Sequence, residues 1–94
     1  IKVDLEDCSG AISDFTKAIE INPGFAEAYC DRGSIKLTLK DYSGAISDYT
    51  KAIEINPGFA DAYCNRGSAK NELKDYSGAI SDYTKAIELK KHCE

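Results

Sequence analysis

The chain has 94 residues, and its 12 basic and 16 acidic side chains leave a formal net charge of −4 at pH 7. This length allows at most one domain with a thin globular core, so an array of small stacked units suits the chain better. The acidic balance argues against nucleic acid or an anionic membrane as a partner, because Lys and Arg drive phosphate binding, and it favours a neutral or basic protein.

An internal repeat with a period of 34 residues dominates the sequence. The segment 22–55 is written again at 56–89 with 28 identical pairs among 34, and 5–21 matches 39–55 at 14 of 17 positions. Such self-similarity indicates one small unit stacked repeatedly. We therefore divide a single array, 1–94, into a partial repeat at 1–21, full repeats at 22–55 and 56–89, and a tail at 90–94. We expect no membrane span and no signal peptide.

The partial repeat consists mainly of one predicted helix. Residues 1–5 match only the tail of the helix that would precede it, and Asp7 stands where an N-cap is expected. The helix ends at Asn22-Pro23-Gly24, a turn signal that cannot continue a helix.

Each full repeat begins with a predicted helix, from Phe25 to about Thr38 and, in the copy, from Phe59 to about Glu72. The connection to the next helix is about three residues long, which favours an antiparallel hairpin. Gly33 and Gly67 interrupt these helices at a cost of roughly 1 kcal/mol relative to alanine. We attribute them to close packing and expect Gly33 to contact Ala45, and Gly67 to contact Ala79.

The second helix of each repeat is amphipathic. In the first full repeat its small and apolar side chains recur at helical spacing, at Ala45, Ile46, Tyr49, Ala52 and Ile53. Asp41 and, one period later, Asp75 stand at the expected N-cap positions.

This pattern resembles the tetratricopeptide repeat family. The family's aromatic, glycine, small residue, second aromatic, alanine and proline fall here on Tyr29, Gly33, Ala45, Tyr49, Ala52 and Pro57, and then on Tyr63, Gly67, Ala79, Tyr83 and Ala86. The chain departs from the family at Arg32 and Arg66, where leucine is frequent, and at Lys36 and Lys70, where tyrosine is frequent. The resemblance implies an all-α fold, a right-handed α-solenoid of antiparallel helix hairpins with about two and a half repeats and five helices.

Catalytic chemistry has little support in the sequence. The single histidine, His92, lies in a charged tail, and the serines and threonines have no histidine within the domain to activate them. Asp14, Asp48 and Asp82 each precede a lysine by three residues, a spacing typical of a solvated helix face. We expect no enzyme activity, no cofactor and no metal site, and we expect Arg32 and Arg66 to pair with those aspartates.

The four cysteines, Cys8, Cys30, Cys64 and Cys93, have neither the spacing of zinc ligands nor the density of a disulfide framework. We interpret them as free thiols in a reducing, cytoplasmic compartment.

The resemblance implies a function in protein–protein interaction. In this family the first helix of each repeat lines a concave groove that receives a peptide, and the matching positions are Glu27, Cys30, Asp31, Ser34, Leu37, Thr38, Asp61, Cys64, Asn65, Ser68, Asn71 and Glu72. Only Asn65 fits the subgroup that clamps the acidic C-terminus of chaperones. The acidic side chains at these positions predict a neutral or basic peptide as partner.

The alternative is a structural or self-associating repeat, natural or designed, with no dedicated ligand. The near-identity of the copies supports it, but four of their six differences fall on the expected groove, which favours binding. The terminal helices would offer apolar side chains for self-association, at Ile12, Phe15, Ile19, Ile80, Tyr83, Ile87 and Leu89.

Overall fold

The computed structural model of the chain describes residues 5–90, which form five α-helices and no strand. The helices are α1 (Leu5–Ile21), α2 (Ala26–Thr38), α3 (Tyr42–Ile55), α4 (Ala60–Glu72) and α5 (Tyr76–Lys90). The prediction of an all-helical fold with five helices is therefore confirmed. Within 5–90 no helix is both long and apolar enough to cross a membrane.

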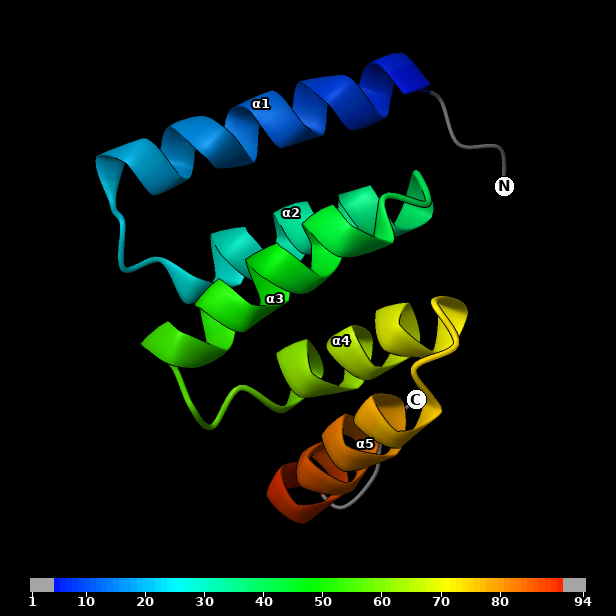
Figure 1. Ribbon diagram of the computed structural model, residues 1–94. Helices are drawn as coiled ribbons and strands as arrows, with labels where there is room; N and C mark the ends of the chain where they lie inside the picture. Colours follow the sequence, from blue (N-terminus) through cyan, green and yellow to red (C-terminus); the bar gives the residue numbers. More distant parts are fainter. Residues whose placement is uncertain (1–4, 91–94) are drawn as a thin grey trace.

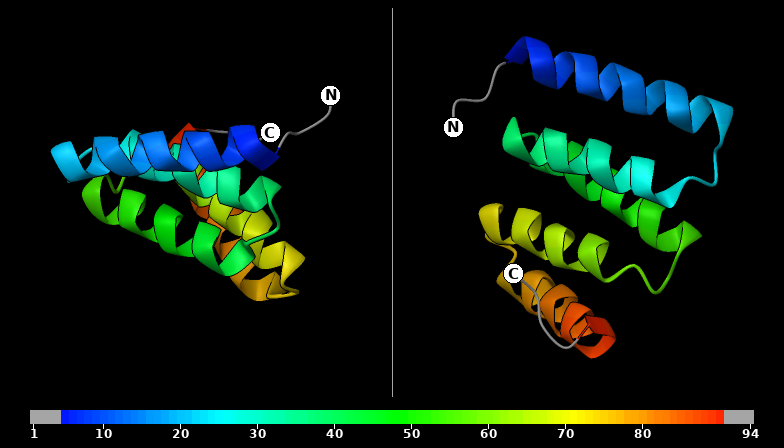
Figure 2. Two further views of the ribbon diagram at one scale, coloured as in Figure 1. Left: turned by 90° about the horizontal axis from the view of Figure 1, so that it is seen from above. Right: turned by 180° about the vertical axis from the view of Figure 1, so that it is seen from behind.

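The helices follow one another from one end of the molecule to the other (Figures 1 and 2). α2 and α3 form one hairpin and α4 and α5 the next, and the hairpins meet through contacts of α4 with α3 and with α2. Among the described helices, α1 contacts only α2 and α5 contacts only α4. The two terminal helices therefore each have a side that no other described helix covers.

Asparagine side chains close the turns between repeats. Asn22 Oδ1 accepts a hydrogen bond from the backbone N–H of Gly24 at 3.2 Å, and Asn56 Oδ1 accepts one from Gly58 at 3.1 Å. This Asx turn, together with the proline between its ends, stops the preceding helix. α2 and α4 then begin at Ala26 and Ala60, one residue later than predicted.

A lysine in the left-handed region makes the turn inside each hairpin. Lys40 and Lys74 both have φ 67°, and the next residue's N–H, that of Asp41, donates to the carbonyl of Lys36 at 2.8 Å. Together these features end the helix in a Schellman-type turn. The following aspartate caps the second helix, because Asp41 Oδ1 accepts from the N–H of Gly44 at 3.1 Å.

The N-cap prediction holds for two of the three aspartates. Asp75 Oδ1 accepts from the N–H of Gly78 at 3.1 Å, as Asp41 does in its own repeat, but Asp7 lies inside α1, which already begins at Leu5. An N-cap residue precedes the first helical residue, whereas Asp7 is the third residue of α1.

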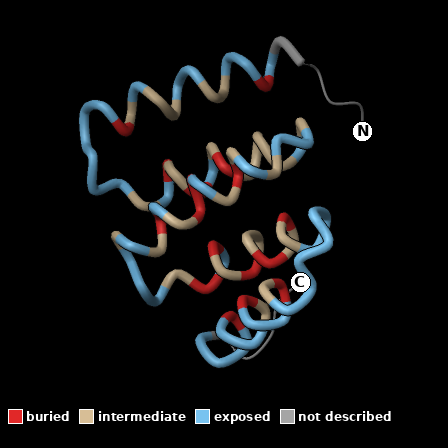
Figure 3. The backbone as a smooth tube through the Cα atoms, in the orientation of Figure 1, coloured by how far each residue is buried: buried red, intermediate tan, exposed pale blue. Residues whose placement is uncertain are grey.

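The core consists mainly of alanines around one tyrosine. Its buried cluster is Cys30, Ala45, Tyr49, Ala52, Ala62 and Ala69. Tyr49 is fully buried, and the buried positions lie where helices face each other (red in Figure 3). Small side chains allow the helices to approach closely, and each tyrosine ring fills the remaining space.

The two helix glycines pack mainly on tyrosine rings. A Cβ at Gly33 would lie 3.0 Å from Tyr49 Cε1 and 3.2 Å from Asp48 Cβ, so its nearest neighbours are Tyr49 and Asp48, and the predicted contact with Ala45 stays a prediction. A Cβ at Gly67 would lie 2.9 Å from Tyr83 Cε1 and 3.2 Å from the carbonyl oxygen of Ala79. The predicted neighbour Ala79 is thus present through its backbone. The ring lies one helical turn beyond the alanine and reaches back over the glycine.

Candidate functional site

α2 and α4, the first helices of the two full repeats, contact each other and carry the predicted groove residues. We call this set the α2/α4 face. Its exposed members are Glu27, Asp31, Thr38, Asp61, Asn71 and Glu72. Its half-buried members are Ser34, Leu37, Asn65 and Ser68, and its buried members are Cys30 and Cys64.

Acidic side chains of both helices act on the Cys30 thiol. The pKa of the Cys30 thiol is raised to about 11. Burial is the largest cause, and the negative charges of Asp31, Asp61 and Glu27 act in the same direction. A hydrogen bond with Asn65 acts in the opposite direction. The thiol is therefore protonated at neutral pH and is a poor nucleophile and metal ligand, since both reactions need the thiolate.

The oxidation state of the cysteines differs from the one expected from the sequence at one position. Cys8 and Cys30 are free and buried, as expected, whereas Cys64 is disulfide-bonded. The expectation that all four cysteines are free thiols is therefore wrong at Cys64, although Cys30 occupies the same position in the preceding repeat. Cys93 and His92 lie outside the described residues. Helical spacing alone carries no information about which of two equivalent thiols is oxidised.

The two serines of the face are engaged by the fold. The hydroxyl of Tyr49 donates to Ser34 Oγ at 3.0 Å, and Ser34 Oγ donates to the carbonyl of Cys30 at 3.1 Å. Tyr83 and Ser68 repeat the arrangement at 3.1 Å. Burial raises the pKa of Tyr49 to about 12, so the phenol keeps the proton that it donates. These serines therefore orient the core tyrosines and have little capacity left for a ligand.

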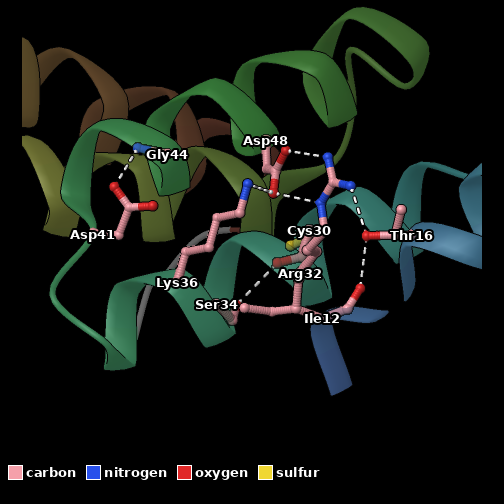
Figure 4. A network of polar contacts seen from close by, with 9 residues as sticks. All are labelled: Ile12, Thr16, Cys30, Arg32, Ser34, Lys36, Asp41, Gly44 and Asp48. Atoms are coloured by element: carbon pink, nitrogen blue, oxygen red, sulfur yellow. Dashed lines mark hydrogen bonds and ion pairs between the residues drawn. The ribbon is translucent and has the colours of Figure 1, made fainter. Parts of the chain in front are cut away.

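Next to this face lies a network of ion pairs in which half-buried basic side chains surround a buried aspartate (Figure 4). Arg32 Nε and Nη2 donate to the two carboxylate oxygens of Asp48 at 2.9 and 2.8 Å, and Lys36 Nζ lies 3.2 Å from Asp48 Oδ2. Arg32 Nη1 also donates to Thr16 Oγ1 at 3.1 Å, which ties the repeat to α1. The guanidinium carbon lies 5.5 Å from the ring centre of Tyr29, within cation–π range.

The second repeat copies this network. Arg66 donates to Asp82 at 2.9 and 2.8 Å and to Thr50 Oγ1 at 3.2 Å, and Lys70 Nζ lies 3.1 Å from Asp82. The predicted pairing of both arginines with aspartates is confirmed for Asp48 and Asp82. Asp14 is exposed and has no ion-pair partner among residues 5–90.

Two parts of this network were missed by the sequence analysis. The threonine acceptors lie 16 residues before each arginine, and the lysines lie four residues after it, one helical turn along the same face. The lysine spacing was visible in the sequence. The threonine contact crosses between repeats and depends on the stacking angle.

The residues proposed for self-association lie in different environments. Ile80, Ile87 and Leu89 are exposed, Ile12 and Phe15 are half-buried, and Ile19 is buried. Tyr83 is also half-buried, because its ring covers Gly67 and its hydroxyl is bonded to Ser68. Ile19 and Tyr83 are thus less accessible than expected. Self-association through the ends stays a prediction.

No group of three or more metal-ligating side chains occurs in the part of the chain that the structure describes. The geometry of the α2/α4 face and the ion-pair network instead provides charge, hydrogen-bond acceptors and fixed helix positions. Those are the elements of a binding surface.

Comparison with known proteins identifies the fold. No curated protein matches the chain. Among solved structures, the tetratricopeptide domain of OM64 from Arabidopsis is similar with 33% identity and a TM-score of 0.87, over 89% of this chain and 69% of that one. A crystal structure of MamA has 30% identity and a TM-score of 0.87, over 93% of this chain and 51% of that one. The chain thus spans about half the length of MamA.

A further similar structure contains a ligand. The first tetratricopeptide domain of Spaghetti (RPAP3), solved with the HSP90 peptide SRMEEVD, shares 29% identity with a TM-score of 0.87, over 90% of this chain and 68% of that one. Proteins of this family are generally non-catalytic interaction scaffolds. The family model described as tetratricopeptide repeat matches residues 26–59 and 60–93, which is more than half of the sequence, with the same 34-residue period. The chain therefore belongs to the tetratricopeptide repeat family.

Proposed function

We propose that this chain is a non-catalytic protein-interaction module that binds a neutral or basic peptide segment of another protein on the α2/α4 face. The observation that carries the proposal is that the exposed carboxylates Glu27, Asp31 and Asp61 lie on two helices, α2 and α4, that contact each other. All three raise the pKa of the Cys30 thiol, in agreement with this placement. Carboxylates from two neighbouring helices thereby act together on one surface, and an oppositely charged segment gains from all of them at once.

The positions of the basic side chains support this charge preference. α2 and α4 carry four of them, Arg32, Lys36, Arg66 and Lys70, and each is paired with Asp48 or Asp82. Their positive charge is thus compensated within the fold. The peptide bound to Spaghetti ends in the acidic sequence EEVD. We infer that such a terminus is disfavoured here, because the α2/α4 face offers exposed carboxylates.

Peptide titrations test the proposal. We expect a lysine-rich extended peptide to bind and the peptide SRMEEVD to bind at least about tenfold more weakly at 0.1 M salt. The affinity of the basic peptide should fall as salt rises, since exposed charges are screened over about 10 Å at 0.1 M. Fluorescence anisotropy with both labelled peptides measures the ratio.

Charge variants locate the site. Asp31→Asn combined with Asp61→Asn should weaken the basic peptide, because it removes two carboxylates from the face, whereas Glu20→Gln on α1 is a matched exposed control that should leave affinity unchanged. Tight binding of SRMEEVD that does not respond to Glu27→Lys contradicts the proposal.

A further inference from the structure

One side of α5 presents large apolar side chains to solvent. Tyr76, Ile80 and Ile87 are 55%, 63% and 48% exposed. With the exposed Thr84 they recur at helical spacing and form one stripe, which we call the end face of α5. α5 contacts only α4 among the described helices, so the end face lies at one end of the stack (Figures 1 and 3).

The same stripe is covered in α3. The sequence 42–54 is identical to 76–88, and Tyr42, Ile46 and Ile53 pack against the core cluster to which α4 contributes. Thr50, the counterpart of Thr84, accepts the hydrogen bond from Arg66. The other exposed side of the two helices does not change, because Lys51 and Lys85 are both exposed. The packing of α4 against α3 therefore shows which kind of helix fits the end face of α5.

The covering helix has a definite pattern. α4 and its N-cap residue present Phe59, Ala62, Arg66 and Ala69, at intervals of three, four and three residues. Ala62 and Ala69 are fully buried in the core cluster, and Phe59 packs at its edge. The alanines let the backbones approach, and the arginine between them supplies the donor for the threonine. This spacing gives one continuous helix face.

We propose that the end face of α5 binds a helix of a partner protein that carries this pattern, an aromatic residue, two alanines and an arginine between them that donates to Thr84 Oγ1. The side-chain hydroxyl of Thr84 has no hydrogen-bond partner among residues 5–90. A second copy of this chain is a poorer occupant, because α1 already covers the matching side of α2, and α3 covers that of α4. The site is separate from the α2/α4 face.

A synthetic peptide provides the probe. It has the sequence of residues 56–73 with Cys64→Ser, an acetylated N-terminus and an amidated C-terminus, and it is titrated into the full chain. We expect saturable binding and chemical-shift changes centred on Ile80 and Thr84. Ile80→Asp should weaken binding at least about tenfold, because it places a charge where an apolar side chain is buried. Lys85→Ser is the matched control on the same helix and should not change the affinity.

A double-mutant cycle tests the register. Arg66→Ala in the peptide and Thr84→Val in the protein should each weaken binding about fivefold, and the two together should cost no more than one alone, because they remove the same hydrogen bond. Circular dichroism of Ile80→Asp and Thr84→Val should match the unchanged chain, since both positions are exposed.

Three results would overturn the proposal. They are absence of saturation at millimolar peptide, binding that is insensitive to Ile80→Asp, and additive effects of the two register variants. Sedimentation of the chain alone supplies the remaining comparison. If it shows self-association that Ile80→Asp abolishes and the peptide does not reduce, a second copy occupies the end face and the proposed partner helix is excluded.

Discussion

α3 and α5 have the same sequence at 13 consecutive positions, 42–54 and 76–88, yet they differ in burial. Ala45, Asp48 and Ala52 are buried, and so are their counterparts in α5, because both helices pack against the first helix of their own repeat. Ile46 and Ile53 are half-buried, whereas Ile80 and Ile87 are exposed. The comparison shows that contacts within a repeat are set by its own sequence, and contacts between repeats by the presence of a neighbour.

The largest expected difference concerns the isoleucine that α4 covers. Ile46→Ala should destabilise the fold by about 2–3 kcal/mol, because it removes packing from the interface between repeats. Ile80→Ala should change stability by less than about 0.5 kcal/mol, since its side chain is exposed. Urea unfolding of both variants measures the two stability losses. Equal losses would show that α5 is covered as α3 is.

The next effect concerns the helix glycines. Gly67→Ala should cost about 1–3 kcal/mol, because a Cβ there would lie 2.9 Å from the ring of Tyr83 and 3.2 Å from a backbone oxygen. Gly10→Ala in α1 is the matched control, since nothing lies within 4 Å of its added Cβ. It should stabilise the chain by up to about 1 kcal/mol through helix propensity alone. Thermal unfolding that shows a gain at both positions would contradict the packing account.

The third prediction concerns acid. Burial alone would raise the pKa of Asp82, but the hydrogen bonds and charges of Arg66 and Lys70 lower it below the ordinary value. A carboxyl with a lowered pKa in the fold adds stability that is complete above its unfolded pKa of about 3.9 and is lost as pH falls below it. We expect the free energy of unfolding to decrease as the pH falls below about 4.

Two variants isolate this contribution. Asp82→Asn should reduce the acid dependence, whereas Asp14→Asn should not, because Asp14 is exposed and has no ion-pair partner within 5–90. Urea unfolding at a series of pH values measures both. An equal reduction by the two variants would show that the ion pair does not cause the acid dependence.

The smallest expected effect lies in the hairpin turns, which do not depend on a neighbouring repeat. Lys40 and Lys74 have φ 67°, a region that glycine occupies without a steric cost. Replacing either by glycine should stabilise the chain by about 0.5 kcal/mol, after the greater freedom of glycine in the unfolded chain is counted. Thermal unfolding should show the same gain at both sites. Unequal gains would mean that the stability of each turn depends on the repeat in which it lies.

Much of the fold could be predicted from the sequence because its causes are local. The Asn-Pro-Gly turns and the caps at Asp41 and Asp75 depend on residues within four positions of one another. The pairing of Arg32 with an aspartate also followed from the repeat, since a half-buried guanidinium needs an acceptor. These interactions recur in each full repeat with nearly equal distances.

The candidate site was predicted less completely. The positions on α2 and α4 came from the family resemblance, but the engagement of Ser34 and Ser68 by tyrosine hydroxyls did not. The oxidation of Cys64 was also missed. Each depends on a side chain that is distant in sequence, and equivalent positions in a repeat give no signal that separates them.

By itself, the sequence determined the period, the helices, their turns and the side of each helix that packs within its own repeat, because these follow from spacing and short-range hydrogen bonds. The tertiary structure alone decided how far each apolar side chain of the last helix is exposed, since Ile80 and Ile87 lie on the surface whereas Tyr83 is half-buried against Gly67. Tyr42 and Tyr76 begin identical sequences, 42–54 and 76–88, but Tyr42 packs against the core cluster to which the following repeat contributes, whereas no described helix follows α5 and Tyr76 is exposed. Burial depends on what packs against a side chain, and a neighbouring helix is a property of the assembled molecule.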